Sequence, residues 1–488
     1  MKPKRINIDE FVFGLTKSEN DYLLKPNQAK NCYNLKIEEG HLIQGNGLTE
    51  LELLCEGDTT EFTKKFIDMG FEIIRVWRYK YFSTIINKTN YALIIYASDK
   101  KLYYSPLFAY TDEFYQVPDV QFNSIPTALN FRAGGKEVIG FCSPTDEFVV
   151  WNCDEQPYIT EGLPKFSCIC LHNGRLFAID SAETNVVKYS SLLNPLDWSS
   201  NQTSTSGGSI ELNDFKGDLK NIISFLDNIY VFSDFGISKI SSFLGNSNFG
   251  VSNVYTTSFK IFCNTACVCG DNILFLTEDG MYKFDGFNVT KLESSFSHLI
   301  KNTTQENAIS SFFEGKYFVA CSLTFGDGKF VGVEKSGNYQ NNALIEYDIN
   351  SCSYSITRGV DVCWLLSVKD LKLSKLFACL RYSHKMYQVD SSGLFGTEPL
   401  EKSWQGGKIN FGNFDKYKIL KEVYLTSLYP CFLKVETETG TQIYNIKKNK
   451  QMQRVRINKR GKFFGIEFYS NNPQVYLSNP QFLFSVQE

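Results

Sequence analysis

The sequence predicts an all-β protein: a β-propeller of about seven blades followed by a small C-terminal β-sandwich. Three observations predict this fold class. A hairpin pattern recurs at an even spacing, aromatic residues are abundant (41 Phe and 27 Tyr in 488 residues), and the strand spacing shortens after residue 400. Aromatic and β-branched side chains fit the pleated, half-buried surface of a sheet, so this composition favours strands over helices.

The clearest hairpin spans Asn272 to Phe284. An apolar run is followed by the turn Glu278-Asp279-Gly280 and then by an alternating run. A tight turn needs a positive φ, which glycine adopts at little cost, so Asp-Gly between two strand-like segments is a strong hairpin signal. We therefore use this segment as the template for the rest of the chain.

Six further segments share the template. The seven hairpins begin near residues 91, 137, 175, 228, 272, 316 and 375, a mean period of about 47 residues. A propeller blade of four strands occupies roughly 40 to 50 residues, so the period matches one blade per hairpin. The alternative, unrelated hairpins stacked in a sandwich, does not explain the even spacing. In the sixth repeat, residues 326–342 enlarge the turn.

The chain divides into an N-terminal arm (1–50), a propeller (51–400) and a sandwich (401–488), in which short strands lie about ten residues apart. The arm contains a hairpin turning at Glu39-Gly40, and residues 27–35 could form one or two helical turns. Residues 51–70 are the best helix candidate, because Asp58 to Glu61 resembles a helix cap, and the alternative is a long loop. The arm either completes a blade or reaches a neighbouring molecule.

Composition excludes several classes of protein. The net charge of −3 predicts no general attraction to nucleic acid or anionic membranes, and no run of about 18 apolar residues could span a bilayer. The N-terminus lacks the apolar core of a signal peptide, so we expect synthesis in a cytoplasm. The 14 cysteines are scattered through apolar runs, which is typical of free buried thiols, and the four histidines are far apart in sequence. We expect no metal and no cofactor.

No catalytic signature is present. The sequence has no Gly-rich phosphate loop, no Gly-x-Ser-x-Gly elbow and no His-Glu-x-x-His motif. Acids recur in the turns at Asp99, Asp234 and Glu278-Asp279. Of these turns, Thr277 to Tyr282 is faintly similar to the Asp-box turn of sialidases, but the box is not clearly repeated and tight turns favour Asp-Gly in any case. The Ser/Thr-rich segment 201–209 is expected to be a mobile surface loop. We therefore expect a protein that is not an enzyme.

The strongest charge feature lies between Lys447 and Lys462, where eight basic residues occur with no acid. They are Lys447, Lys448, Lys450, Arg454, Arg456, Lys459, Arg460 and Lys462. On a strand, Arg454 and Arg456 share one face, while Val455 and Ile457 share the other. The stretch is either a solvated sheet face or a contact with an acidic protein or with phosphates. The absence of interleaved aromatic residues argues against stacking on single-stranded nucleic acid.

Three stretches resemble the virion propellers of tailed bacteriophages: Arg175 to Asp180, Val187 to Ser199 and Asn228 to Ile240. The shared pattern is a strand, a second strand ending in a Ser-rich link to Asn194-Pro-Leu-Asp-Trp198, and a further hairpin. The arm, at Gln28 to Leu35 and Gly40 to Leu48, is similar to the N-terminal stretch of those proteins. The segment from Trp404 to Phe468 also resembles theirs.

This resemblance implies a structural component of the virion at the neck or tail, either at the head–tail junction or in the tail hub. Several copies would form a ring around the portal–tail axis, in contact with portal, connector or tail proteins and with one another, and a contact with DNA is open. The alternative is a receptor- or glycan-binding propeller at the tail tip. The enlarged turn 326–342 departs from the family pattern.

Overall fold

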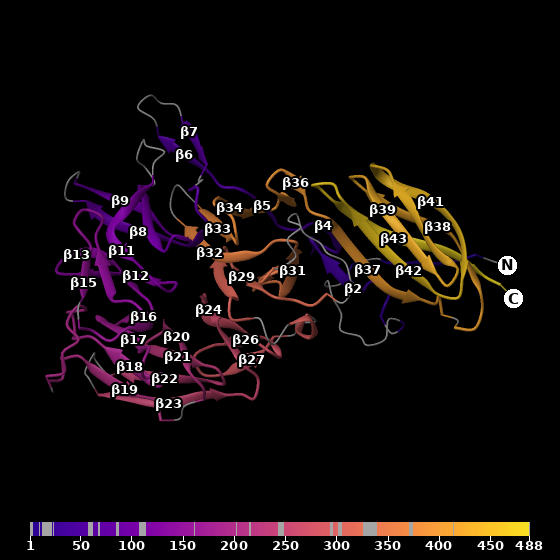
Figure 1. The fold of residues 1–488 in the computed structure, drawn as a ribbon. Helices are drawn as coiled ribbons and strands as arrows, with labels where there is room; N and C mark the ends of the chain where they lie inside the picture. The colour runs from indigo at the N-terminus through magenta and orange to yellow at the C-terminus, as the bar shows by residue number, and fades with distance from the viewer. Residues whose placement is uncertain are drawn as a thin grey trace.

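The computed structural model describes residues 3–487 except 9, 12–21, 23, 57–61, 67–68, 84–86, 107–113, 161, 202, 214–215, 243–247, 293–295, 301–304, 326–338, 370–373 and 413. The protein is all-β: a β-propeller of seven four-stranded blades is followed by a β-sandwich that lies at one side of the ring (Figure 1). The helical element Ser297–Leu299 is a single 3-10 turn. Among the described residues, no helix has the length and apolar character needed to cross a bilayer.

Each blade is an antiparallel sheet; in blades one to six the strands follow in chain order from the inside of the ring outward, and in blade seven the outer strand comes from the N-terminal arm. Blades one to three comprise β8 (Ile73–Ser83), β9 (Lys88–Ala97), β10 (Lys101–Pro106) and β11 (Tyr115–Gln121); β12 (Thr127–Ala133), β13 (Lys136–Cys142), β14 (Phe148–Trp151) and β15 (Tyr158–Thr160); and β16 (Phe166–His172), β17 (Arg175–Asp180), β18 (Val186–Tyr189) and β19 (Gly208–Glu211). Blades four and five comprise β20 (Leu219–Phe225), β21 (Asn228–Ser233), β22 (Gly236–Ser242) and β23 (Phe249–Thr256); and β24 (Ile261–Cys269), β25 (Asn272–Thr277), β26 (Gly280–Phe284) and β27 (Val289–Lys291). Blades six and seven comprise β28 (Ile309–Phe313), β29 (Lys316–Cys321), β30 (Ala343–Asp348) and β31 (Ser353–Arg358); and β32 (Val362–Lys369), β33 (Ser374–Leu380), β34 (Met386–Asp390) and β5 (Gly47–Glu50).

The seven predicted hairpins are the second and third strands of the seven blades. In the template hairpin, Thr277 pairs with Gly280, so the two central turn residues are Glu278 and Asp279. Gly280 follows them with a φ of 133°. The glycine is therefore used at the first position of β26 rather than inside the turn.

Hydrogen bonds between adjacent inner strands close the ring. The Asn221 side chain in β20 donates to the Cys263 carbonyl in β24 (2.9 Å). Between the last and first blades, the Trp364 indole in β32 donates to the Val76 carbonyl in β8 (2.6 Å). These bonds satisfy polar groups that apolar packing between blades would leave buried.

The arm contributes to both parts of the fold. Strand β5 is the outer strand of blade seven, where Leu48 pairs with Val389 of β34 and is completely buried. Short strands β35 (Leu394–Phe395) and β36 (Glu398–Pro399) extend this sheet beyond β5. One of the two roles expected for the arm, completing a blade, is thus performed by its last four residues.

The sandwich is built from the first and last segments of the chain. One sheet has the order β3-β4-β43-β38-β41, with β1 on β43, and the other has the order β2-β37-β42-β39-β40. The strands are β1 (Lys4–Asn7), β2 (Ala29–Tyr33), β3 (Leu35–Glu38), β4 (His41–Gln44), β37 (Lys402–Ile409), β38 (Lys418–Ser427), β39 (Cys431–Thr437), β40 (Gly440–Ile446), β41 (Asn449–Gly461), β42 (Phe464–Ser470) and β43 (Tyr476–Val486). Between the sheets lies the fully buried Trp404, whose ring centroid is 5.1 Å from that of Phe11 and 6.0 Å from that of Phe468.

Both helical expectations are wrong. Residues 29–33 are strand β2, because pairing with β37 satisfies backbone groups that one helical turn would leave open. In the 51–70 segment, β6 (Glu52–Glu56) pairs with β7 (Phe62–Phe66). That segment has only a partial apolar face for a helix, and a short helix without one is unstable in water. The cap-like residues 58–61 lie outside the described residues, as do residues 326–338 of the enlarged turn.

Candidate functional site

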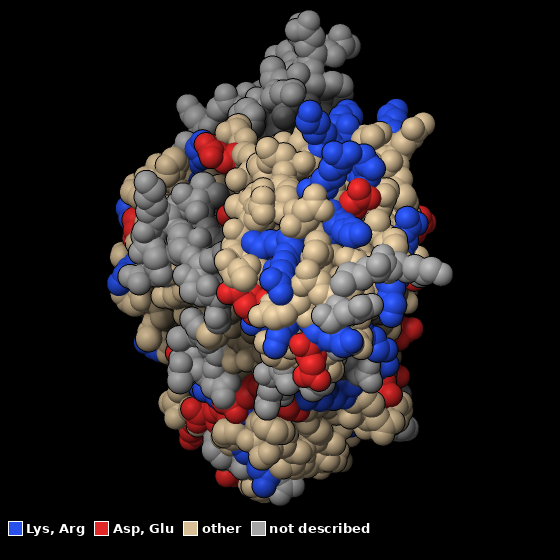
Figure 2. Space-filling model, turned by 90° about the vertical axis from the view of Figure 1, so that its right-hand side faces the viewer, with Lys and Arg blue, Asp and Glu red and all other residues tan. Residues whose placement is uncertain are grey.

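The basic stretch forms one edge of the sandwich. Six of its eight cations are exposed, and the other two, Lys459 and Lys462, are half-buried. Most of them lie on β41, the last strand of its sheet. Figure 2 shows Lys and Arg side chains spread over this end of the molecule, with fewer Asp and Glu among them.

The pairing of β41 with β38 sets the directions of these side chains. Arg454 lies opposite Tyr424, and Arg456 lies opposite Glu422. Arg454 and Arg456 are exposed, whereas Ile457, the next residue along the strand, is buried, as the predicted alternation requires. Asn458 has a φ of 53° and lies where the register shifts, so the alternation changes before Lys459 and Arg460.

Tyrosines from neighbouring segments lie beneath these cations. The Arg460 guanidinium is 4.4 Å from the centroid of the Tyr417 ring, and the Lys462 amine is 5.3 Å from it. On β38, Tyr424 is in similar contact with Arg5 of β1 at 5.1 Å. The sequence analysis missed these aromatic residues because they come from other strands. Their spacing of about 30 residues from β41 gave no local signal.

Glu422 lies within this basic face. Its carboxylate accepts a hydrogen bond from the Tyr424 hydroxyl (2.6 Å) and is 3.6 Å from the Arg454 guanidinium. The hydrogen bond to the carboxylate raises the pKa of Tyr424 above its usual value. The face is therefore a mixed surface of cations, tyrosines and one acid rather than a uniform field of positive charge.

Charge is segregated along the chain. Residues 401–488 hold 14 basic and 7 acidic residues, a formal charge of +7, whereas residues 51–400 hold 29 and 39, a charge of −10. The arm has seven of each. Residues 101–300 alone hold 12 basic and 22 acidic residues, and they form blades two to five and the two outer strands of blade one. The C-terminal part of the sandwich is thus positive, and the propeller is negative.

Asn34 joins the arm, the propeller and the sandwich. Its side-chain amide donates to the carbonyls of Arg358 (3.1 Å) and Glu401 (2.6 Å), and its carbonyl oxygen accepts from the Arg358 N–H (2.7 Å). Its own N–H donates to the Ile356 carbonyl (2.8 Å). Asn34 is buried with a φ of 57°, a conformation that asparagine adopts more readily than most residues. Blade six is therefore fixed to the first and last segments of the sandwich by one side chain.

A second link is a buried ion cluster at the same junction. Glu346 of β30 lies 2.6 Å from the Lys36 amine of β3 and 2.5 Å from the Lys316 amine of β29, and it also accepts a hydrogen bond from Asn46. Burial raises the pKa of the Glu346 carboxyl, but the two ammonium groups outweigh it and hold that pKa below its usual value. The carboxylate therefore stays ionised and binds the β3–β4 hairpin to blade six.

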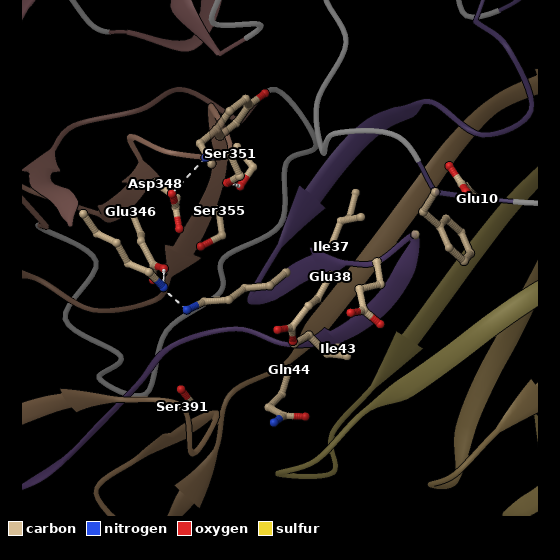
Figure 3. Close-up of a pocket in the computed structure, with 17 residues that line it drawn as sticks. Glu10, Ile37, Glu38, Ile43, Gln44, Glu346, Asp348, Ser351, Ser355 and Ser391 are labelled. Atoms are coloured by element: carbon tan, nitrogen blue, oxygen red, sulfur yellow. Dashed lines mark hydrogen bonds and ion pairs between the residues drawn. The ribbon is translucent and has the colours of Figure 1, made fainter. Parts of the chain in front are cut away.

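These residues border a cleft of about 710 Å³ between the hairpin and blade six (Figure 3). Glu10, Glu38 and Glu39 line the sandwich side, and Asp348 and Tyr354 line the propeller side. In the part of the chain that the structure describes, no group of three or more His, Cys, Asp or Glu side chains could hold a metal ion. The cleft is thus a polar, acid-rich space beside a rigid junction.

We expect Glu346→Gln to lower the free energy of unfolding by about 3 kcal/mol, because two partly buried ammonium groups lose their counterion. Since the folded-state pKa of Glu346 is depressed, its contribution is present above the usual carboxyl pKa and is lost as the pH falls through the lowered value. Urea unfolding at pH 7 and pH 3 checks this. An equal difference between wild type and variant at both pH values would contradict it, and Lys36→Met in a double-mutant cycle measures the coupling.

Lys402 predicts a different pH dependence. Burial lowers the pKa of its amine to about 8, although the amine donates to the carbonyls of Gly393 (3.0 Å) and Leu400 (2.8 Å). The unfolded chain then binds more protons than the folded one from about pH 8 upward to the usual lysine pKa, so stability rises with pH there. Relative to Lys402→Met, the wild type should gain stability between pH 7 and pH 9 in urea titrations. A constant difference would show that the lysine stays fully charged.

In the stretch that resembles phage propellers, a loop is hydrogen-bonded to a buried arginine. Arg175 is 1% exposed and donates to the carbonyls of Ser190 (2.7 Å), Ser206 (2.8 Å) and Ser204 (3.0 Å). The Trp198 ring stacks on Phe166 with centroids 4.7 Å apart. Residues 203–209 are therefore hydrogen-bonded to blade three: residues 203–205 are exposed, as expected for a surface loop, whereas Ser206 and Gly207 are buried.

No family model matches this chain, and no curated protein matches it. Solved structures similar to it include BBS1N in complex with ARL6DN (TM-score 0.40, 11% identity, 70% of this chain and 96% of that one). Virginiamycin B lyase from Staphylococcus aureus (0.40, 8%, 67% and 99%) and the WD40 β-propeller domain of Doa1 (0.28, 9%, 52% and 88%) are also similar. Likenesses this weak carry no argument about function.

Proposed function

We propose that this protein is a non-enzymatic structural component of a tailed-phage virion, located at the neck or tail and present in several copies around the portal–tail axis. The observation that carries the proposal is the resemblance of residues 175–180, 187–199 and 228–240 to phage virion propellers. Arg175 donates to the Ser190 carbonyl and so joins the first two of these stretches within blade three, and residues 228–240 are the central hairpin of blade four. The resemblance thus concerns strands and a buried contact of blades three and four.

The architecture supports an assembly role. A propeller offers broad rigid faces made of loops, and rigid faces suit repeated docking around an axis. The junction at Asn34 and Glu346 fixes the sandwich to the ring, so contacts made at either end are held in one geometry. The partners expected from this role are portal, connector or tail proteins and further copies of the chain.

The second candidate is a receptor- or glycan-binding propeller at the tail tip. The junction cleft favours it, because carboxylates such as Glu38 and an aromatic ring, Tyr354, line the same space. Carboxylates and aromatic faces are suitable contacts for the hydroxyls and apolar faces of a sugar.

Deleting the gene from the phage tests the two candidates against each other. If the protein has the neck or tail role, infected cells should accumulate separate heads and tails, or heads that lose their DNA, when lysates are viewed by negative-stain microscopy. Complete particles that fail to adsorb would contradict the structural role and favour the receptor-binding one. Complementation with a plasmid-borne wild-type gene controls for effects on neighbouring genes.

A further inference from the structure

The segregation of charge gives the basic face a specific partner. We propose that the face formed by β41 and its neighbours docks on the acidic side of the propeller of a second copy, so that copies join head to tail. This inference rests on the multi-copy assembly proposed above and names the surfaces that form it. The basic face is on the sandwich, and the excess of acidic residues is in blades one to five of the propeller, of which blades two and three lie on the side of the ring away from the sandwich (Figure 1).

The direction of the contact follows from this arrangement. A contact between two different surfaces of identical chains is heterologous, and it closes into a ring when the rotation per copy divides a full turn. A symmetric contact between two basic faces would instead place like charges together and cost free energy. The charges of +7 on residues 401–488 and −10 on residues 51–400 are of similar size, so each copy carries the complement of its neighbour.

The composition of the face favours a protein surface over nucleic acid. Glu422 lies within the face, opposite Arg456 in the sheet register, and its carboxylate can pair with a lysine or arginine of a protein partner, which a phosphate backbone does not offer. Tyr417 is 39% exposed beneath Arg460, and arginine and tyrosine are the residues enriched at the centres of protein interfaces. The net negative charge of the propeller would also repel a DNA duplex. We therefore assign the face to a second copy.

The test uses full-length protein and the double variant Arg454→Glu/Arg456→Glu. Sedimentation velocity at 50 mM salt should show association of the wild type, and the variant should raise the dissociation constant about 100-fold, since it puts like charges against the acidic side. Wild-type association should also weaken in 500 mM salt because of screening. The control Lys80→Glu/Lys369→Glu makes the same change in net charge on blades one and seven and should associate normally.

Carbodiimide cross-linking identifies the contact surfaces. In a mixture of ¹⁴N- and ¹⁵N-labelled copies, mixed-isotope cross-links should join lysines between Lys447 and Lys462 to acids within residues 101–300. Three results would overturn the inference: a wild type that stays monomeric at low salt, cross-links that join other surfaces, or equal weakening of association by both double variants. So would salt-dependent binding of a DNA duplex that the arginine variant abolishes.

The two proposals can fail separately. If the chain is found in the virion but its basic face contacts another protein, the head-to-tail contact is wrong and the proposed function stands. If the chain is absent from the virion but associates through these surfaces, the proposed function is wrong and the head-to-tail contact stands.

Discussion

The variant Leu48→Asp should lose the folded propeller. Leu48 is completely buried in β5, the strand by which the arm completes blade seven. The substitution removes a large apolar side chain and buries a carboxylate, a combination that costs more than about 5 kcal/mol. Because the whole free energy of unfolding of a domain is about 5–15 kcal/mol, we expect most molecules to unfold or to open at this blade.

Circular dichroism and limited proteolysis measure this effect, and Glu50→Gln is the matched control. Glu50 lies on the same strand and its carboxylate is 2.8 Å from the Lys385 amine, a half-exposed pair that contributes at most about 1 kcal/mol. Retention of a wild-type melting temperature in Leu48→Asp would contradict closure by β5.

Asn34→Ala should have the second largest effect, a loss of roughly 3–6 kcal/mol of stability. Three side-chain hydrogen bonds are removed, and each leaves a buried backbone group of Arg358 or Glu401 without its partner. Alanine at a φ of 57° adds about 1 kcal/mol of backbone strain. The sandwich should then loosen from blade six, with faster hydrogen exchange in β31 and β37.

Two variants separate these causes. Asn34→Gly loses the same hydrogen bonds but tolerates the positive φ. It should therefore be more stable than Asn34→Ala by the backbone strain of about 1 kcal/mol. Asn34→Asp keeps the acceptor for the Arg358 N–H and loses the two donated bonds. If all three variants unfolded at the wild-type urea concentration, the junction would not depend on this side chain.

The propeller could be predicted from the sequence because its signal is local. Each blade repeats one hairpin, and the two central strands of a hairpin are adjacent in sequence, so apolar runs such as Asn272–Thr277 were recognisable individually. By contrast, no local sequence signal shows how the arm is divided between the propeller and the sandwich. Strands β2 and β5 pair with partners more than 300 residues away, β37 and β34, and no pattern within residues 1–50 specifies which part joins which domain.

The candidate site was predictable to a similar extent. The run from Lys447 to Lys462 and its alternation on a strand were visible in the sequence, but its tyrosines and Glu422 come from other segments. The junction residues Asn34 and Glu346 were missed because their partners lie far apart in the chain. An isolated asparagine or glutamate in a strand-like run gives no sign that it is buried.

Cryo-electron microscopy of intact phage from a producing strain is the most direct test of the proposed function. The proposed function predicts copies of this chain ringed between the portal and the tail or in the tail hub. The head-to-tail contact further predicts that the Lys447–Lys462 face is turned toward the propeller of the neighbouring copy. Copies only at the distal tip would contradict the structural role and make host glycans the next partner to test. Absence of the chain from the particle would contradict both candidate functions.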